Sequence, residues 1–402
     1  MPVAPRIDSL GTYDSGRVAI ATVKRIFHVV NFPLLLSSAL LTAYGLLIVY
    51  SATLDSADFS YNRQLLGVVM GAALLLVLWR LDYHRLEEWV IPLIVFDLLL
   101  ILSPLFPIIG VEVNGARSWI SFFGQQIQPS EPAKILTIVI LAALVSKYRG
   151  KLNSGKEYLK CLGVLLILLM AIMMQPDLGT GMVFFAIAIS ILLAGGAHWK
   201  WLLLTLMAIA AVIALMIYID PILDKAAGRD VLIKDYQMNR LLVFMDENLD
   251  PTGAGYHLKQ AKIAIGSGGL LGKGLHNGTQ AVLGFLPEAP TDFIFCVLAE
   301  ELGFLGCIVL LALYGGLIIS SFWVAFKADD PFGTLIIMGC VGMWVFQILE
   351  NIGMTCGLMP ITGIPLPFVS YGSSFMLTNF MAVGMILSVW THRSVKKGRG
   401  DR

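Results

Sequence analysis

The chain has 402 residues, of which 57% are hydrophobic and only 14% are charged. Soluble domains carry about 25% charged residues, so this composition excludes an ordinary soluble globular protein. The net charge is only +1, which gives no basic field of the kind that attracts nucleic acid. Apolar runs such as 32–50, 159–174 and 202–218 can cross a hydrocarbon core of about 30 Å at roughly 1.5 Å per residue. The sequence therefore predicts a protein that crosses a membrane several times.

Hydropathy along the chain predicts an all-α polytopic membrane protein. Backbone that faces lipid must satisfy its own hydrogen bonds, and the apolar runs are too long for the strands of a barrel. About ten transmembrane helices are expected, and they begin near Phe32, Leu65, Val90, Ala133, Leu159, Gly179, Trp201, Phe293, Phe332 and Leu366. Residues 359–372 contain three closely spaced prolines, so no continuous helix is expected there.

Positive charge sets the expected orientation. Most Lys and Arg residues lie in segments that ten spans place on the side of the two termini, and short positive segments favour the cytoplasm. We therefore expect a cytoplasmic N-terminal segment (1–31), a ten-helix transmembrane domain (32–391) and a cytoplasmic basic tail (392–402). The transmembrane domain includes a long extracytoplasmic segment (220–292) between the seventh and eighth spans. A segment of this length is seldom a mere connector, so function is expected at the outer face.

Ionisable residues in or beside the spans are candidates for function, because each is costly in lipid. They are Glu131, Lys134, Asp177, Asp292, Glu300, Glu301 and Glu350. Glu131 and Lys134 share a helix face, and they either form a structural ion pair or offer the lysine to a phosphate. Asp177 follows a proline and is interpreted as a helix N-cap. Asp292 either caps the eighth span or lies at the mouth of an outer cavity, enclosed enough to be perturbed.

Other chemistries find no support in the sequence. Residues 266–274 resemble a nucleotide phosphate loop, but Ser267 and Gly274 stand where that motif needs glycine and a hydroxyl. The six histidines are scattered, so neither a histidine-based metal site nor a Ser-His-Asp triad is expected. The five cysteines lie in apolar runs and are interpreted as small buried hydrophobes.

Six segments of the chain together resemble the motifs of the SEDS family, to which RodA and FtsW belong. They keep the order of the family motifs and lie at residues 114–120, 128–134, 175–180, 250–256, 286–295 and 366–372. Residues 278–280 and 298–301 are more similar to RodA, the elongation member, than to FtsW, the division member. Pro290, Ser118 and Ser373 depart from the family pattern.

The resemblance implies a peptidoglycan glycosyltransferase that polymerises lipid II at the outer face of the bacterial cytoplasmic membrane during cell elongation. It implies as partners a class B penicillin-binding protein, which is a transpeptidase, and the membrane lipids. Carried over residue by residue, the essential aspartate of the family falls on Asp292 and its loop tryptophan on Trp119. The Glu and Lys pair falls on Glu131 and Lys134, and the serine on Ser370.

The chemistry of lipid II gives these residues expected roles. An α-linked donor and a β-linked product require one inverting displacement, so Asp292 is the candidate general base. Lys134 is expected to stabilise the departing pyrophosphate, with Arg117, Arg240 or a divalent cation, Mg²⁺ or Mn²⁺, as further candidates. No other cofactor is expected, and no metal ligands are assigned.

Two alternatives stay open. A lipid II flippase or other polyprenyl-lipid transporter would also use charges within the membrane, but it needs a polar path to the inner face, where the spans offer few polar residues. A scaffold would merely position a penicillin-binding protein. For any such partner, the expected contacts are small residues of the eighth and ninth spans that face lipid, such as Gly315, Gly316, Gly339 and Gly342.

Overall fold

The computed structural model describes residues 30–54, 59–113, 116–122, 125–148, 152, 154–175, 177–227, 235–246, 248–251, 253–286 and 288–393. Most of the expected cytoplasmic N-terminal segment and of the basic tail lie outside these residues, as do Asn114 and Gly115 of the first family motif.

Ten helices of the described chain coincide with the ten predicted spans. They are α2 (Phe32–Thr53), α3 (Tyr61–Arg80), α5 (Val90–Leu102), α6 (Ser130–Ser146), α7 (Gly155–Met173), α8 (Leu178–Ala194), α9 (Trp199–Ala227), α13 (Ile294–Phe326), α14 (Pro331–Cys356) and α15 (Ser373–His392). By length and composition, six of them can cross a membrane: α2, α3, α9, α13, α14 and α15. The others are shorter or, in α7, carry three charged residues near the start. The predicted all-α polytopic fold class is confirmed.

Short elements connect these helices. They are α4 (His84–Glu88), the 3₁₀ turn η1 (Ser103–Leu105), α10 (Asp235–Met245), α11 (Ala254–Gly268) and α12 (Thr279–Val282). Between α5 and α6 lies an antiparallel sheet in the order β1 (Gly110–Val113), β2 (Ala116–Phe122) and β3 (Gln125–Ile127). Its Val, Ile, Trp and Phe residues favour strands.

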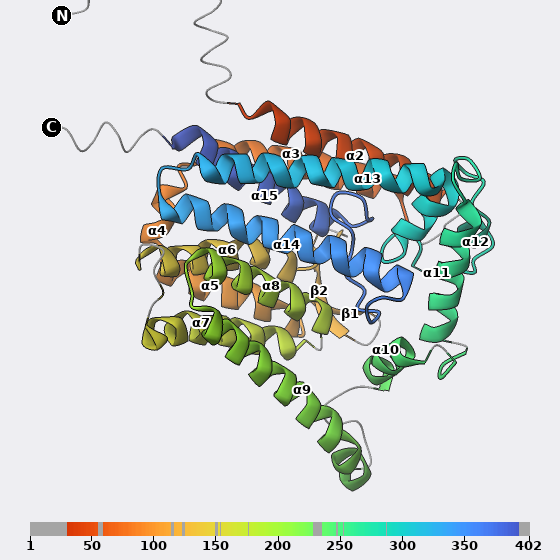
Figure 1. Ribbon diagram of the computed structural model, residues 1–402, viewed down its shortest axis with the longest axis horizontal. Helices are drawn as coiled ribbons and strands as arrows, with labels where there is room; N and C mark the ends of the chain where they lie inside the picture. Colours follow the sequence, from red (N-terminus) through yellow and green to blue (C-terminus); the bar gives the residue numbers. More distant parts are fainter. Residues whose placement is uncertain are drawn as a thin grey trace, which may run out of the picture.

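The short elements gather at one end of the bundle. Figure 1 shows the start of α2, the end of α15 and α4 at one end of the helices, and β1, β2 and α10 to α12 at the other. Trp79 of α3 donates to Thr391 of α15 at 2.7 Å near the first end. At the opposite end the side chain of Gln64 donates to the carbonyl of Ser370 at 3.3 Å. We call the end that carries the sheet and α10 to α12 the outer end.

Helices α14 and α15 form the centre of the bundle, whereas α9 lies at its edge. Most of α15 is buried, and α3 packs along it at glycines. A Cβ on Gly71 would approach the ring of Phe380 to 2.5 Å, and one on Gly384 would approach the carbonyl of Leu75 to 2.9 Å. Small residues let two helices approach in this way. In α9 no residue of the most apolar window is buried, so its side chains face outward.

The tenth span differs from the prediction at its start. Helix α15 begins at Ser373 and not near Leu366, because the chain from Gly357 to Gly372 is irregular, with Pro365 and Pro367 in it. Phe368 in this segment has a φ of 62°, which a helix does not allow. As the prolines predict, no helix continues through this stretch.

Candidate functional site

Asp292 lies in the turn that leads into α13 at the outer end of the bundle. The backbone N–H of Asp292 donates to the carbonyl of Glu288 at 3.1 Å, and its own carbonyl accepts from the side chain of Asn351 at 2.9 Å. The N-cap of α13 is Phe293, and no side chain caps this helix. The carboxylate of Asp292 is therefore not used as a helix cap, which settles one alternative left open by the sequence.

The surroundings of this carboxylate disfavour its charged form. Burial, followed by the charge of Glu288, raises the pKa of Asp292 to about 7, although Arg240 and a hydrogen bond from Thr291 act in the opposite direction. Asp292 keeps partial contact with solvent. A partly accessible carboxyl group that titrates near neutral pH is suited to accept a proton from a substrate.

Gly363 brings Asp292 close to a polar pocket. With a φ of 75°, its backbone passes so near Asp292 that a Cβ would lie 2.9 Å from the carboxylate oxygen Oδ2. The same Cβ would lie 3.6 Å from a guanidinium nitrogen of Arg240, which comes from α10. Gly363 also lines the pocket, so one residue of the irregular segment separates Asp292 from it.

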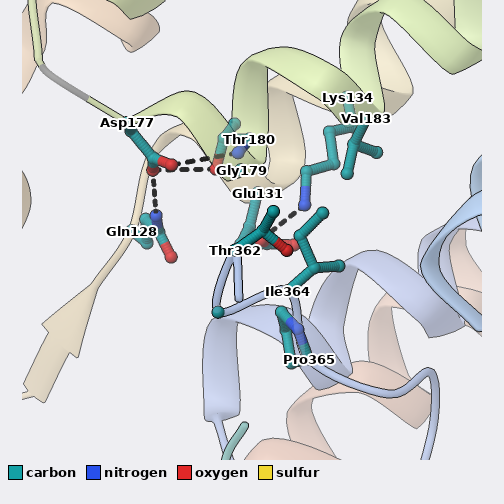
Figure 2. Close-up of a pocket in the computed structure, with 11 residues that line it drawn as sticks. Gln128, Glu131, Lys134, Asp177, Gly179, Thr180, Val183, Thr362, Ile364 and Pro365 are labelled. Atoms are coloured by element: carbon teal, nitrogen blue, oxygen red, sulfur yellow. Dashed lines mark hydrogen bonds and ion pairs between the residues drawn. The ribbon is translucent and has the colours of Figure 1, made fainter. Parts of the chain in front are cut away.

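The pocket lies between α6, α8 and the irregular segment that follows α14 (Figure 2). Its volume is about 70 Å³. It is lined by Gln128, Glu131, Lys134, Asp177, Gly179, Thr180, Val183, Thr362, Gly363, Ile364 and Pro365. Two predicted site residues, Glu131 and Lys134, thus meet in one cavity.

Glu131 and Lys134 form the predicted ion pair. The ammonium Nζ of Lys134 lies 2.6 Å from Oε1 of Glu131, and both side chains are buried. Among the described residues, Oε2 of Glu131 has no hydrogen-bond partner. Lys134 also lies 5.8 Å from the ring centroid of Phe375. An ammonium has three N–H donors, so the ion pair leaves Lys134 with donors for another acceptor. Binding of phosphate by Lys134 stays a prediction.

Asp177 caps α8, as predicted. Its Oδ1 accepts from the backbone N–H of Thr180 at 2.9 Å, and its Oδ2 accepts from the Thr180 hydroxyl at 2.8 Å. The side chain of Gln128 donates to the same Oδ2 at 3.1 Å (Figure 2). The cap therefore also fixes one wall of the pocket.

Ser370 is fully buried and connects the irregular segment to the turn of Asp292. Its hydroxyl donates to the carbonyl of Thr291 at 2.7 Å and accepts from the backbone N–H of Leu366 at 2.7 Å. A second bond joins the same two segments, from the N–H of Tyr371 to the carbonyl of Pro290 at 2.8 Å. The hydroxyl of Ser370 is therefore bonded to Thr291, the residue that precedes Asp292 in the chain.

Trp119 and Arg117 lie on β2 and are not among the residues that line the pocket. They are two residues apart, so they lie on the same face of the strand. Arg117 is exposed, and Trp119 pairs with Val111 across the sheet and is partly exposed. The structure brings them to the outer end without bringing them to the pocket.

Asn351 is a buried polar residue beside Asp292 that the sequence did not single out. Its side-chain nitrogen donates to the carbonyl of Asp292 at 2.9 Å and to that of Ile364 at 2.8 Å. The neighbouring Glu350 accepts from the hydroxyl of Thr362 at 2.6 Å. Polar residues at successive turns of an apolar span were a usable signal for this cluster.

Asp97 of α5 was also missed. It is fully buried within an apolar helix and accepts from the hydroxyl of Thr137 at 2.8 Å. Among the described residues, no group of three or more His, Cys, Asp or Glu side chains is placed to hold a metal ion.

The expected partner surface needs correction. A Cβ on Gly339 would lie 2.8 Å from Ile138, and one on Gly342 would collide with Ser190, so these glycines face α6 and α8 inside the bundle. Gly316 faces Ser37 of α2 at 3.1 Å. Of these four glycines, only Gly315 would have nothing within 4 Å of an added Cβ. The prediction of four glycines that face lipid was wrong for three, because hydropathy alone does not show which side of an apolar helix packs inward.

A helical bundle with a buried ion pair and a polar pocket at its outer end defines a multi-pass membrane protein with a site between its helices. The family of cell cycle proteins that comprises FtsW, RodA and SpoVE matches residues 32–395, and the chain belongs to it.

Relatives and solved structures agree with this assignment. The peptidoglycan glycosyltransferase MrdB of Escherichia coli (strain K12) is 34% identical over 360 residues, which cover 88% of this chain and 92% of that protein. A chain from a peptidoglycan synthase complex that coordinates polymerization and crosslinking matches with a TM-score of 0.73 at 29% identity, covering 90% of this chain and 97% of that one. The rod shape determining protein RodA of Thermus thermophilus matches with a TM-score of 0.65 at 28% identity, covering 90% and 96%.

Proposed function

We propose that the chain polymerises lipid II into glycan strands at the outer face of the bacterial cytoplasmic membrane during cell elongation. It is a peptidoglycan glycosyltransferase of the SEDS family. The observation that carries the proposal is Asp292, a carboxyl group with a pKa of about 7, beside the pocket that holds Lys134.

The reaction is an inverting displacement with Asp292 as general base. A sugar hydroxyl of one lipid II attacks the anomeric carbon of another, and Asp292 takes the hydroxyl proton while the bond to pyrophosphate breaks. One displacement converts the α-linked donor into a β-linked product, so no enzyme nucleophile is needed. A positioned general base of this kind contributes roughly 10²- to 10⁴-fold to the rate. A pKa near 7 leaves a large share of the carboxyl group ionised at neutral pH.

The leaving pyrophosphate gains negative charge, which fixed cations stabilise. Lys134 offers such a cation in the pocket, and Arg240 offers another beside Asp292. Trp119 and Arg117 lie outside the pocket on β2, where they contact parts of the substrate beyond the reacting sugar. Ser370 acts through the position of the turn that carries Asp292.

A divalent cation would neutralise pyrophosphate charge when bound. The described residues offer it a poor site. Glu288 places a second negative charge near Asp292, but in the described part of the chain no three His, Cys, Asp or Glu side chains are grouped to hold a metal ion. We therefore assign no step of the reaction to a metal.

The partner and the orientation belong to the same proposal. The related complex is named for polymerization and crosslinking together, so we propose a class B penicillin-binding protein as transpeptidase partner. We place the start of α2 and the end of α15 at the cytoplasmic face and the site at the outer face, which puts the described part of residues 220–292 on the extracytoplasmic side.

The test is a lipid II polymerisation assay with purified protein and its partner. Asp292→Asn keeps the shape of the side chain but removes its basicity, so glycan synthesis should fall by at least about 10²-fold. The matched control is Asp246→Asn, since Asp246 is an exposed carboxylate of the same extracytoplasmic segment. Near-normal rates with Asp292→Asn, in protein of normal thermal stability, would remove Asp292 from the mechanism.

A further inference from the structure

Helix α13 consists of two pieces that meet different surroundings. Gly303 interrupts it with a φ of 65° and a ψ of −163°. On the outer side of this break, every residue from Ile294 to Glu301 is buried in protein. On the inner side, Phe304 and Leu305 are 59% and 47% exposed. The side chains of α13 that can contact lipid therefore begin at Gly303.

The inner piece is long enough to cross the membrane by itself. From Gly303 to Phe326 it extends about 36 Å at 1.5 Å per residue, against a hydrocarbon core of about 30 Å. The outer boundary of the hydrocarbon core consequently lies close to Gly303. The outer piece, with Asp292 just before it, lies beyond that boundary.

The turn after α11 is attached to α13 at this level. The N–H groups of Phe304 and Leu305 donate to the carbonyls of Gly269 and Leu270 at 2.9 and 3.2 Å. In the opposite direction, the N–H of Lys273 donates to the carbonyl of Glu300 at 3.0 Å. These bonds pair backbone groups that the break in α13 leaves without helical partners. Figure 1 shows α11 beside the outer end of α13.

The side chains of this turn face outward and are apolar. Leu270 is 63% exposed and Leu271 is 73% exposed, although backbone bonds to α13 hold Leu270 and, two residues after Leu271, Lys273. The nearest charged residue along the chain, Lys273, is directed toward α13, because its ammonium lies 2.5 Å from Oε1 of Glu300 and 2.8 Å from the hydroxyl of Thr279. The turn therefore presents two leucines and no charge at the level where lipid begins.

We propose that residues 269–271 insert into the outer leaflet as a re-entrant anchor, with phospholipid acyl chains around Leu270 and Leu271. Two observations support lipid as the occupant. The exposed leucines continue the lipid-facing surface of α13 at Phe304 and Leu305. Irregular backbone at membrane depth also requires protein partners for its polar groups, and the bonds to α13 supply them.

This inference goes beyond the catalytic proposal, and only its choice of the outer leaflet rests on the orientation proposed above. It means that the turn after α11 is fixed in height at the membrane. The same attachment holds the outer piece of α13, and hence the turn of Asp292, at a constant height above the hydrocarbon core.

The depth of a nitroxide label tests the anchor directly. The full chain, without its five native cysteines, carries Leu271→Cys and is reconstituted alone in phosphatidylglycerol and phosphatidylcholine nanodiscs. Matched labels replace Asn277, which is exposed in the same loop, and Leu311, which is exposed within α13. The label at 271 should gain accessibility to oxygen and lose accessibility to a water-soluble nickel complex, as at 311 and unlike 277.

Two results would overturn the anchor. Nickel accessibility at 271 equal to that at 277 would place the turn in water. Shielding from both reagents would mean that protein, such as a second copy, covers it. If the cysteine-free chain does not fold, Leu271→Trp in the native chain replaces the label. Brominated acyl chains should quench its added fluorescence, whereas that of Asn277→Trp should stay unquenched, and equal quenching of the two would contradict the proposal.

Discussion

At the scale of single residues, Asp292 makes activity dependent on pH. A general base must be ionised, and burial together with Glu288 raises the pKa of this carboxyl group to about 7. The initial rate of polymerisation should therefore rise as pH increases through about 7 and then level off. A rate that stays flat from mildly acidic to neutral pH, with substrate saturating, would argue against Asp292 as the base.

The raised pKa of Asp292 also makes the stability of the folded protein depend on pH, in the direction opposite to activity. Between the unfolded pKa of 3.8 and the folded pKa of about 7, the folded state binds more protons than the unfolded state. Stability therefore decreases as pH rises through this interval and is constant above it. Asp292→Asn should remove this part of the pH dependence of the melting temperature, measured on the same samples.

Glu131 and Lys134 allow structure to be separated from chemistry. Breaking a buried ion pair at one partner costs about 3–5 kcal/mol, because the other charge stays buried and unpaired. Glu131→Gln and Lys134→Met should each lower the melting temperature, and the double variant should recover most of the loss. Its glycan synthesis should stay low, because the cation for pyrophosphate is gone. Recovery of both stability and activity would make the pair purely structural.

The contacts at the site show which residues a sequence can predict. The Glu131–Lys134 pair and the Asp177 cap join residues three apart, so helix geometry alone suffices to foresee them. The bond from Ser370 to Thr291 spans 79 residues, and that from Asn351 to Asp292 spans 59. Such contacts depend on how the helices pack, and no local pattern specifies them.

At the scale of elements, the ten spans followed from hydropathy because burial in lipid demands long apolar helices. The start of α15 shifted, since the prolines before it break the helix, and the three-stranded sheet after α5 was not foreseen. Its strands are only three to seven residues long and lie next to polar residues, so they give little periodic signal.

The face of α13 around Gly315 is where we expect the partner to bind. This glycine leaves open space beside it, whereas Gly339 packs against Ile138 and Ile191. Gly315→Leu should reduce co-purification of the penicillin-binding protein by filling the approach between two helices. The melting temperature of the chain alone should stay unchanged.

Gly339→Leu serves as the contrasting variant. It should lower the melting temperature, because overpacking of a filled interior costs about 1–3 kcal/mol. Undiminished co-purification with Gly315→Leu would place the partner on another face.

At the scale of the whole molecule, the candidate site lies at one end of the bundle. The pocket, Asp292, Arg240 and the β-sheet all lie at the outer end, together with the irregular segment after α14. A transporter exposes its site alternately to both faces, commonly from broken helices near the midplane. Among the described residues, the break of α13 at Gly303 and the irregular segment after α14 both lie toward the outer end. This asymmetry favours a polymerase over a flippase.

The most direct measurement is therefore made where no membrane separates two faces. Purified chain with its penicillin-binding partner is incubated with lipid II in detergent, and the products are resolved by glycan length. We expect long glycan strands from the native chain. The same preparation in liposomes is assayed for transfer of lipid II between leaflets, and none is expected. Transfer in liposomes without polymer in detergent, under any partner or divalent-cation condition, would contradict the polymerase and identify a flippase.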